Sequence, residues 1–190
     1  MNTTDTRMSA EEISILAGMV GKRFEKYRCD EFVFSPAVYQ IIGLYVDDRT
    51  FALLNETQEL DYFGSIDDVA VIGVKAVAPD EIRSHVVGGQ MVETPVDQII
   101  EDVIVITDTE YMSKDGADLY RYDFTAAIVF VLPDRQIVFE RDCWFSEDFL
   151  VYRGPDAFEK IKTAEENASK SNTLDVRMER RIVHLANEVA

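Results

Sequence analysis

The pattern that most constrains the fold is a strict alternation of large side chains between residues 120 and 132. Side chains of one apolar face occupy every second position there: Tyr120, Tyr122, Phe124, Ala126, Ile128, Phe130 and Leu132. Neighbouring side chains of a β-strand point to opposite faces, so this spacing predicts a strand. After residue 126 the opposite face also becomes apolar, which predicts that the strand enters the interior of a sheet halfway along.

Shorter β-rich runs surround this strand. Val38–Val46, Arg49–Asn55 and Asp68–Val77 predict a three-stranded antiparallel meander. Ile137–Phe145 and Phe149–Arg153 predict strands after a turn at 133–135. Residues 78–98 contain two prolines and a Gly-Gly pair, and we expect an irregular loop there. Together these runs predict an antiparallel sheet of about seven strands in two blocks.

Helical spacing predicts helices at both ends of the chain. Ser9 and Glu12 form the sequence of a capping box, and apolar residues at helical spacing extend the expected helix over 9–28. A second helix is expected after Gly154-Pro155, and a third over 174–189, although the latter pattern also allows a last strand. The expected fold class is therefore α+β, with an N-terminal helix, the antiparallel sheet and one or two C-terminal helices.

The length of 190 residues suits a single domain over 1–190. We expect residues 1–8 to be a flexible N-terminus and residues 167–190 to form a polar joint followed by the terminal helix. That helix is also where a homo-oligomer would form, by docking on a neighbouring chain.

The negative charge is concentrated in the middle of the chain. Between Asp30 and Asp156 there are 26 acids and 8 bases, while both flanking regions are close to neutral. Such a field repels nucleic acids and anionic membranes and favours partners with a basic or mixed surface. We therefore expect a protein partner and no binding of nucleic acid or membrane.

The compartment follows from the absence of an export-type or spanning segment in this sequence. The longest uncharged run, Phe32–Val46, is shorter than the roughly 20 apolar residues needed to cross a bilayer. We expect a soluble, cytoplasmic protein in which Cys29 and Cys143 are reduced thiols.

No motif for catalysis or cofactor binding accompanies these features. The sequence contains no G-x-S-x-G elbow, no Walker A loop and no G-x-G-x-x-G turn, so we expect no cofactor. Asp108 and Glu110 share one strand face and are the weak candidates for a hard cation, although we expect no metal centre. Cys143, beside Trp144 in an expected strand, is better explained as a structural thiol than as a nucleophile.

Two main hypotheses about function remain open. The first is a non-enzymatic protein-interaction module, with an inhibitor that imitates nucleic acid as a variant of it. The second is a small enzyme or ligand-binding domain, whose pocket would be lined by the weak binding candidates His85, Tyr120, Tyr122 and Trp144. The missing catalytic motifs favour the first hypothesis, so we expect a protein without enzymatic activity rather than an enzyme.

Overall fold

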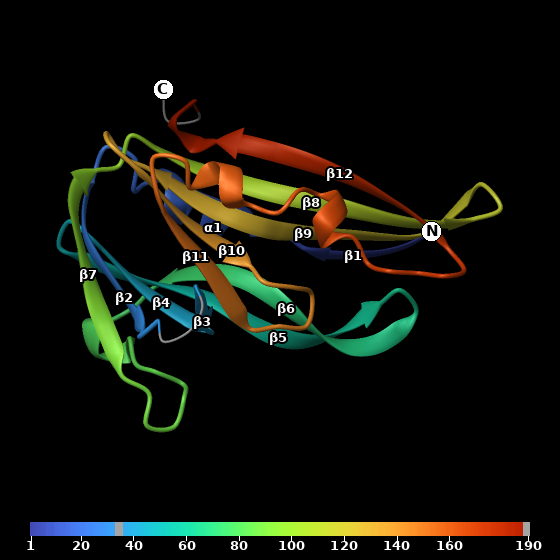
Figure 1. Cartoon of the computed structure of the whole chain (residues 1–190), viewed down its shortest axis with the longest axis horizontal. Helices are drawn as coiled ribbons and strands as arrows, with labels where there is room; N and C mark the ends of the chain where they lie inside the picture. Colours follow the sequence, from blue (N-terminus) through green and yellow to red (C-terminus); the bar gives the residue numbers. More distant parts are fainter. Residues whose placement is uncertain (33–35, 188–190) are drawn as a thin grey trace.

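The computed structural model describes residues 1–32 and 36–187, which form two packed β-sheets (Figure 1). The seven-stranded sheet has the order β12 (Asp175–His184), β8 (Asp102–Lys114), β9 (Ala117–Val131), β10 (Gln136–Arg141), β11 (Asp148–Gly154) and β3 (Ala37–Tyr39). Its last member, β1 (Asn2–Thr6), pairs in parallel with the first half of β9. The five-stranded sheet has the order β6 (Ser65–Ala76), β5 (Arg49–Tyr62), β4 (Ile41–Val46), β2 (Arg23–Asp30) and β7 (Met91–Ile99).

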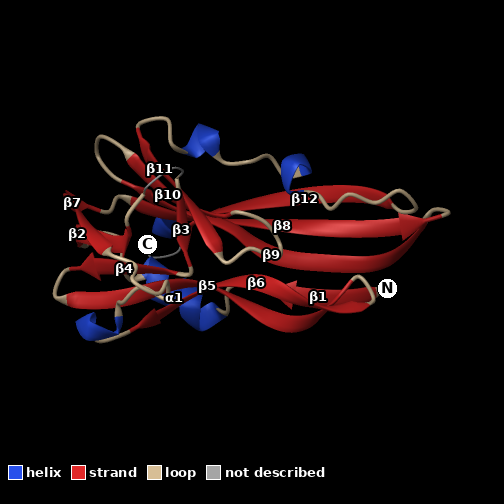
Figure 2. Ribbon diagram, turned by 60° about the horizontal axis from the view of Figure 1, so that its bottom comes forward, coloured by secondary structure: helices blue, strands red, loops and turns tan. Residues whose placement is uncertain are grey.

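Helical structure is limited to short segments. The α-helix in the described residues is α1 (Ala10–Ala17), and four 3₁₀ turns are η1 (Pro79–Glu81), η2 (Phe158–Lys160), η3 (Glu165–Asn167) and η4 (Leu185–Asn187). Figure 2 shows the strands in two layers, with η2 and η3 outside the layer that contains β8, β9 and β10.

The main core lies between the two sheets and is built from aromatic and branched side chains. Phe24 of β2 lies 5.1 Å from Phe130 of β9, and Tyr27 lies 5.8 Å from Phe139 of β10, measured between ring centroids. All four rings are buried. Aromatic pairs at these distances add to the hydrophobic stabilisation from their burial, so they hold the two sheets together.

The other face of the seven-stranded sheet is also covered. We call residues 157–170 the covering segment, because Ala157 and Ile161 pack there on the outward-facing side chains of β8, β9 and β10. At the far end of the same face, Tyr62 and Val69 of the β5–β6 hairpin join this second cluster. Both faces of the middle strands of this sheet are therefore buried, which explains why the second half of β9 is apolar throughout.

The expected α+β fold class is wrong, because the described residues are mostly strand. The capping box at Ser9 and Glu12 is present, but the helix ends at Ala17 and β2 begins at Arg23. The register of β2 shifts between Phe24 and Lys26. This bulge turns Phe24 and Tyr27 to the same side, so a strand imitates helical spacing.

The helix expected after Gly154 is replaced by the 3₁₀ turns η2 and η3. The backbone N–H groups of Phe158, Lys162 and Ser169 donate to side chains of the sheet instead of to helix carbonyls. Tertiary hydrogen bonds thus replace the helical ones, while the apolar spacing still buries Ala157, Ile161 and Ala164.

The expected terminal helix is likewise strand β12, paired with β8 over its whole length. Met178 and Ile182 are four residues apart, and that spacing puts two side chains on one face in a helix and in a strand alike. Val189 lies outside the described residues. The homo-oligomer contact was expected on that helix, and oligomerisation itself stays a prediction.

Several strands were placed correctly. The long strand is β9, and β4, β5 and β6 form the expected antiparallel meander. Residues 78–90 are largely irregular, but the end of the expected loop forms β7. Residues 2–6, for which we expected flexibility, form β1 beside β9.

Candidate functional site

The covering segment is held by acceptor side chains that point outward from the sheet. The N–H of Phe158 donates to Gln136 at 2.9 Å, that of Lys162 to Glu140 at 2.9 Å, and that of Ser169 to Glu110 at 2.7 Å. A chain without regular structure must find acceptors for its buried N–H groups elsewhere. The polar residues of this sheet face supply them.

A buried ion pair joins the same layer to β12. Asp108 is 0% exposed, and both of its oxygens accept from Arg180 at 2.7 Å. Asn167 of the covering segment donates to the same carboxylate at 3.1 Å. Arg180 also donates to the carbonyl oxygen of Lys162 at 2.7 Å. The charge of Asp108 is thus compensated by a bidentate arginine, as burial requires.

Glu140 of β10 is buried with only one oxygen satisfied. Its Oε1 accepts from the N–H of Lys162, while Oε2 has no hydrogen-bond partner among the described residues. Burial raises the pKa of Glu140 to about 7, opposed by that hydrogen bond and by the charges of Lys162 and Arg180. Asp108 adds to the increase, and Glu140 in turn helps to raise the pKa of Tyr152 on β11. Glu140 therefore titrates near neutral pH.

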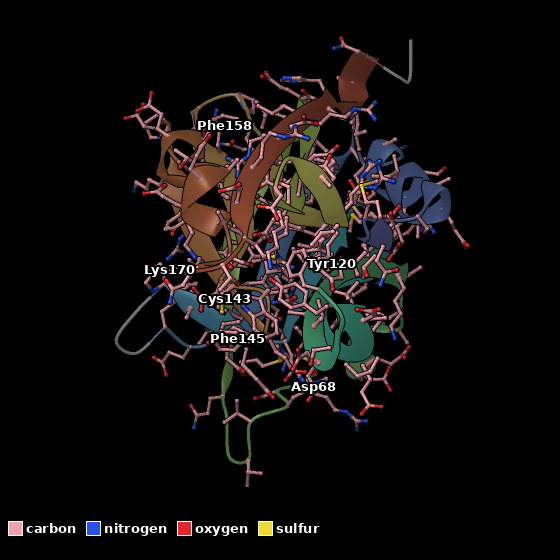
Figure 3. The ribbon with its side chains drawn as sticks, turned by 90° about the vertical axis from the view of Figure 1, so that its right-hand side faces the viewer. Asp68, Tyr120, Cys143, Phe145, Phe158 and Lys170 are labelled. Atoms are coloured by element: carbon pink, nitrogen blue, oxygen red, sulfur yellow. The ribbon has the colours of Figure 1, made fainter. Side chains whose placement is uncertain are left out.

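A cavity of about 550 Å³ opens beside this layer, between the turn after β10 and the end of the covering segment. Figure 3 shows Cys143, Phe145 and Lys170 together on this side of the molecule. The lining residues are Arg141, Asp142, Cys143, Trp144, Phe145, Lys162, Glu166, Asn167, Ala168, Ser169 and Lys170. This volume is within the usual range of sites for small molecules.

Arg141 is the buried cation of this cavity, with 5% of its surface exposed. Its Nη1 donates to the carbonyl oxygen of Ala70 at 3.2 Å and to the hydroxyl of Tyr122 at 2.9 Å. Its guanidinium also lies 3.9 Å from the centre of the Phe124 ring. No carboxylate lies within 4.0 Å of Arg141 in the described parts of the chain.

Aromatic rings form one wall of the cavity. The indole of Trp144 stacks on the ring of Tyr62, with centroids 4.3 Å apart and planes 17° apart. The carbonyl oxygen of Trp144 accepts from the N–H of Ala70 at 2.7 Å, which fixes the turn to the edge of β6. Phe145, the next residue, is 60% exposed at the cavity. An exposed aromatic ring beside a buried unpaired cation is an uncommon combination on a protein surface.

The weak binding candidates are only partly brought together. Tyr122 and Trp144 both contact Tyr62. Trp144 lines the cavity, whereas Tyr122 lies outside its lining and accepts a hydrogen bond from Arg141. Tyr120 lies instead against Phe63, at 5.9 Å between ring centroids. His85 is bonded to Gln40 and lines a different hollow, beside Ile41 and Ala52.

The other chemical candidates are engaged in structural contacts. Asp108 and Glu110 do share a face, but Arg180 and Ser169 occupy their oxygens. No group of three or more His, Cys, Asp or Glu residues that could hold a metal ion occurs in the part of the chain described. Both cysteines are free, and Cys143 lines the cavity without a histidine among the other lining residues.

Sequence reasoning missed the two central charges, Glu140 and Arg141. Both residues follow directly on the apolar run of β10. Two adjacent charged residues at the end of an apolar strand were the signal that could have identified them. Glu140 is bonded to the covering segment, which the sequence placed in a helix, and Arg141 is bonded to Ala70 and Tyr122, which are distant in the sequence.

A second hollow of about 460 Å³ lies between β1, α1 and the inner side of β8 and β12. Arg7 lines it but is bonded to Asp5 through two nitrogens, and Arg181 there is exposed. This hollow therefore offers no buried cation that lacks a carboxylate.

Comparison with known protein families, with curated proteins and with solved structures gives no match to this chain. Of the helices in the described residues, none has the length and apolar character needed to span a membrane. The assignment of function therefore depends on the molecule's own surface and cavity.

Proposed function

We propose that the protein is a non-enzymatic interaction module that binds a protein partner with a basic or mixed surface through the β5–β6 hairpin. The observation that carries this proposal is the uncompensated charge of the hairpin. Five acids and no base occur between Thr50 and Val74, namely Glu56, Glu59, Asp61, Asp67 and Asp68. None of these acids has an ion pair within 4.0 Å among the described residues.

The register of the hairpin supports the proposal. Glu59 and Asp68 are directly opposite each other across the two strands, and both are exposed. Like charges at opposed positions destabilise a hairpin, so this arrangement is unfavourable in the isolated protein. A basic partner surface would relieve the repulsion between Glu59 and Asp68, and this relief would favour binding.

The tip of the hairpin adds an apolar contact. Ile66 is 69% exposed and is followed by Asp67 and Asp68. Interfaces commonly combine a few apolar anchors with a charged rim, where the charges mainly accelerate association and select the partner. The hairpin presents both kinds of side chain in one short segment.

The test is partner capture from lysate of the source cell with three tagged proteins. The first is the wild type, the second carries Glu59→Lys and Asp68→Lys, and the third carries Asp48→Lys and Glu101→Lys as a control of equal charge change. All three are compared at about 0.05 M and about 0.5 M salt, which bracket weak and strong screening.

We expect a discrete partner that the wild type and the control variant retain at low salt and the hairpin variant loses. Equal retention by the hairpin variant would contradict the role of the hairpin. If DNA or RNA displaces the partner in competition, the protein belongs to the nucleic-acid-mimic variant of this class. Circular dichroism of all three proteins checks that the substitutions leave the fold intact.

A further inference from the structure

The geometry points to a binding site for a small aromatic carboxylate in the cavity beside the covering segment, with Arg141 as its anchor. The site is separate from the hairpin and does not depend on the protein-interaction role. The inference rests on the charge of Arg141, on the free donors of its side chain and on the aromatic wall.

The charge of Arg141 lacks the compensation that its neighbour Arg180 has. Arg180 binds the buried Asp108 with two nitrogens, whereas Arg141 relies on a carbonyl, a hydroxyl and the Phe124 ring. Burial raises the pKa of Glu110, and the nearby charge of Arg141 acts to lower it. The oxygens of Glu110 accept hydrogen bonds from Ser169 and not from Arg141. A buried charge in this state gains from a bound counter-charge.

The donors that remain on Arg141 suit a planar anion. Only Nη1 of Arg141 is hydrogen-bonded among the described residues, so Nε and Nη2 are left without a partner. These two nitrogens lie on the same edge of the guanidinium and together match the two oxygens of a carboxylate. Arg141 lines the cavity, and these two nitrogens are the atoms through which we propose that it binds the ligand.

The charges around the cavity favour a ligand with one negative charge over a phosphate. Lys162 is already paired with Asp142 at 3.2 Å, and Glu166 is a second acid of the lining. Among the other lining residues, Arg141 and Lys170 carry two positive charges and Glu166 one negative charge, which leaves one positive charge in the lining for the ligand. A dianion would meet repulsion from the two acids, and a monocarboxylate would neutralise the site.

The aromatic wall indicates the body of the ligand. Trp144 is held in place by its stacking on Tyr62, and the exposed ring of Phe145 lies 5.1 Å from it at 79°. A flat apolar ring would cover Phe145 and remove its surface from water. The site therefore combines an anion anchor with a rigid aromatic surface, as ligand sites with few polar groups usually do.

Trp144 provides a direct probe, because it is the only tryptophan of the chain. Its indole N–H gives a single signal in a two-dimensional ¹⁵N spectrum of the full-length protein. We would titrate this signal with benzoate, with the neutral analogue benzamide and with inorganic phosphate. The expected result is a saturable shift with benzoate and a much weaker response to the other two.

Two variants and a control assign the binding to Arg141 and to the wall. Arg141→Lys keeps the charge but loses the two-nitrogen fork, so benzoate affinity should fall about tenfold. Phe145→Ala changes an exposed side chain and should leave the fold intact. It should lower the affinity for benzoate by a smaller factor than Arg141→Lys does. Arg181→Lys, an exposed arginine in the other hollow, should bind benzoate as the wild type does.

The outcomes separate the alternatives. No saturable shift with benzoate in the wild type would overturn the proposal, as would unchanged affinity in Arg141→Lys. Benzamide binding as tightly as benzoate would show an apolar hollow without an anion anchor and would also overturn it. Phosphate binding as tightly as benzoate would reject the monocarboxylate assignment. Loss of benzoate binding in the hairpin variant Glu59→Lys/Asp68→Lys would contradict the independence of the two sites.

Discussion

The two faces of the seven-stranded sheet are both buried, yet they consist of different chemistry. The inner face carries apolar side chains such as Phe130 and Phe139, which pack on the other sheet. The outer face mixes apolar residues with the buried charges Asp108, Glu110 and Glu140. The difference follows from what covers each face, because a second sheet satisfies its own backbone whereas the covering segment needs acceptors from the sheet.

The largest effect is expected on the inner face. Phe130→Ala removes a fully buried ring that contacts Phe24 and Phe139, and we expect a loss of about 3–5 kcal/mol in the free energy of unfolding. Urea denaturation measures it. A loss below about 1 kcal/mol would mean that the two sheets are not packed as described.

On the outer face, Asp108→Ala should cost about 3 kcal/mol, because it leaves Arg180 without its carboxylate in a largely buried position. The double variant Asp108→Leu/Arg180→Met removes both charges and should recover most of that loss in the same urea experiment. If the double variant is as unstable as the single one, the outer face is held by packing and not by charge compensation.

Glu140 should make stability depend on pH near neutrality. Its pKa is raised from 4.5 to about 7 in the folded protein, so the folded state binds the proton more tightly than the unfolded state. The contribution of Glu140 to the free energy of unfolding is therefore fully present below about pH 4.5 and is lost as the pH rises through about 7.

The matched variant for this effect is Glu140→Gln, which cannot ionise. We expect its unfolding free energy relative to wild type to rise by about 2 kcal/mol between about pH 5 and about pH 8. The same substitution at the exposed Glu159 should give no pH-dependent difference. A constant difference for Glu140→Gln at both pH values would contradict the burial of this carboxyl.

The smallest expected effect tests the hydroxyl of Ser169. Its Oγ contacts Glu110 at 3.1 Å and Tyr62 at 2.7 Å, while its N–H bonds to Glu110 separately. Ser169→Ala should therefore cost about 1 kcal/mol and leave the backbone contact in place. Thermal unfolding is the measurement, and a loss as large as that of Asp108→Ala would show that the hydroxyl, not the N–H, holds the segment.

The sequence predicted the inner face better than the outer one, for a physical reason. The alternation over residues 120–132 identified strand β9 and its burial. Its side chains divide between the two faces, however, because the register with β8 shifts near Thr107: Phe124 lies on the outer face and Phe130 on the inner one. The helical spacing at Phe24 and Tyr27 came from a bulge, and that of Met178 and Ile182 from the period they share with a strand. Neither ambiguity can be resolved without knowing which strands pair.

The candidate site was predictable only in part. Trp144 and Tyr122 were expected to line a pocket together with His85 and Tyr120; the structure places Trp144 in the lining of the cavity and Tyr122 against Arg141, and His85 at another hollow. Glu140 acquires its character from the covering segment, where it accepts from the N–H of Lys162, and Arg141 acquires its own from Ala70 and Tyr122, which are distant in the sequence. Hydrogen bonds between residues that are distant in the sequence produce no periodic pattern in a single sequence.

The most direct measurement is amide hydrogen exchange of residues 157–170. If sheet side chains hold this segment, the N–H groups of Phe158, Lys162 and Ser169 should exchange more slowly than those of Glu159 and Lys160, which donate only within their own 3₁₀ turn. The N–H of Val87, in the exposed stretch 85–90, provides the fast reference. Equal protection of these five amides would indicate that the sheet side chains do not hold the segment, and exchange of Phe158, Lys162 and Ser169 as fast as at Val87 would show an open segment; either result would contradict the account.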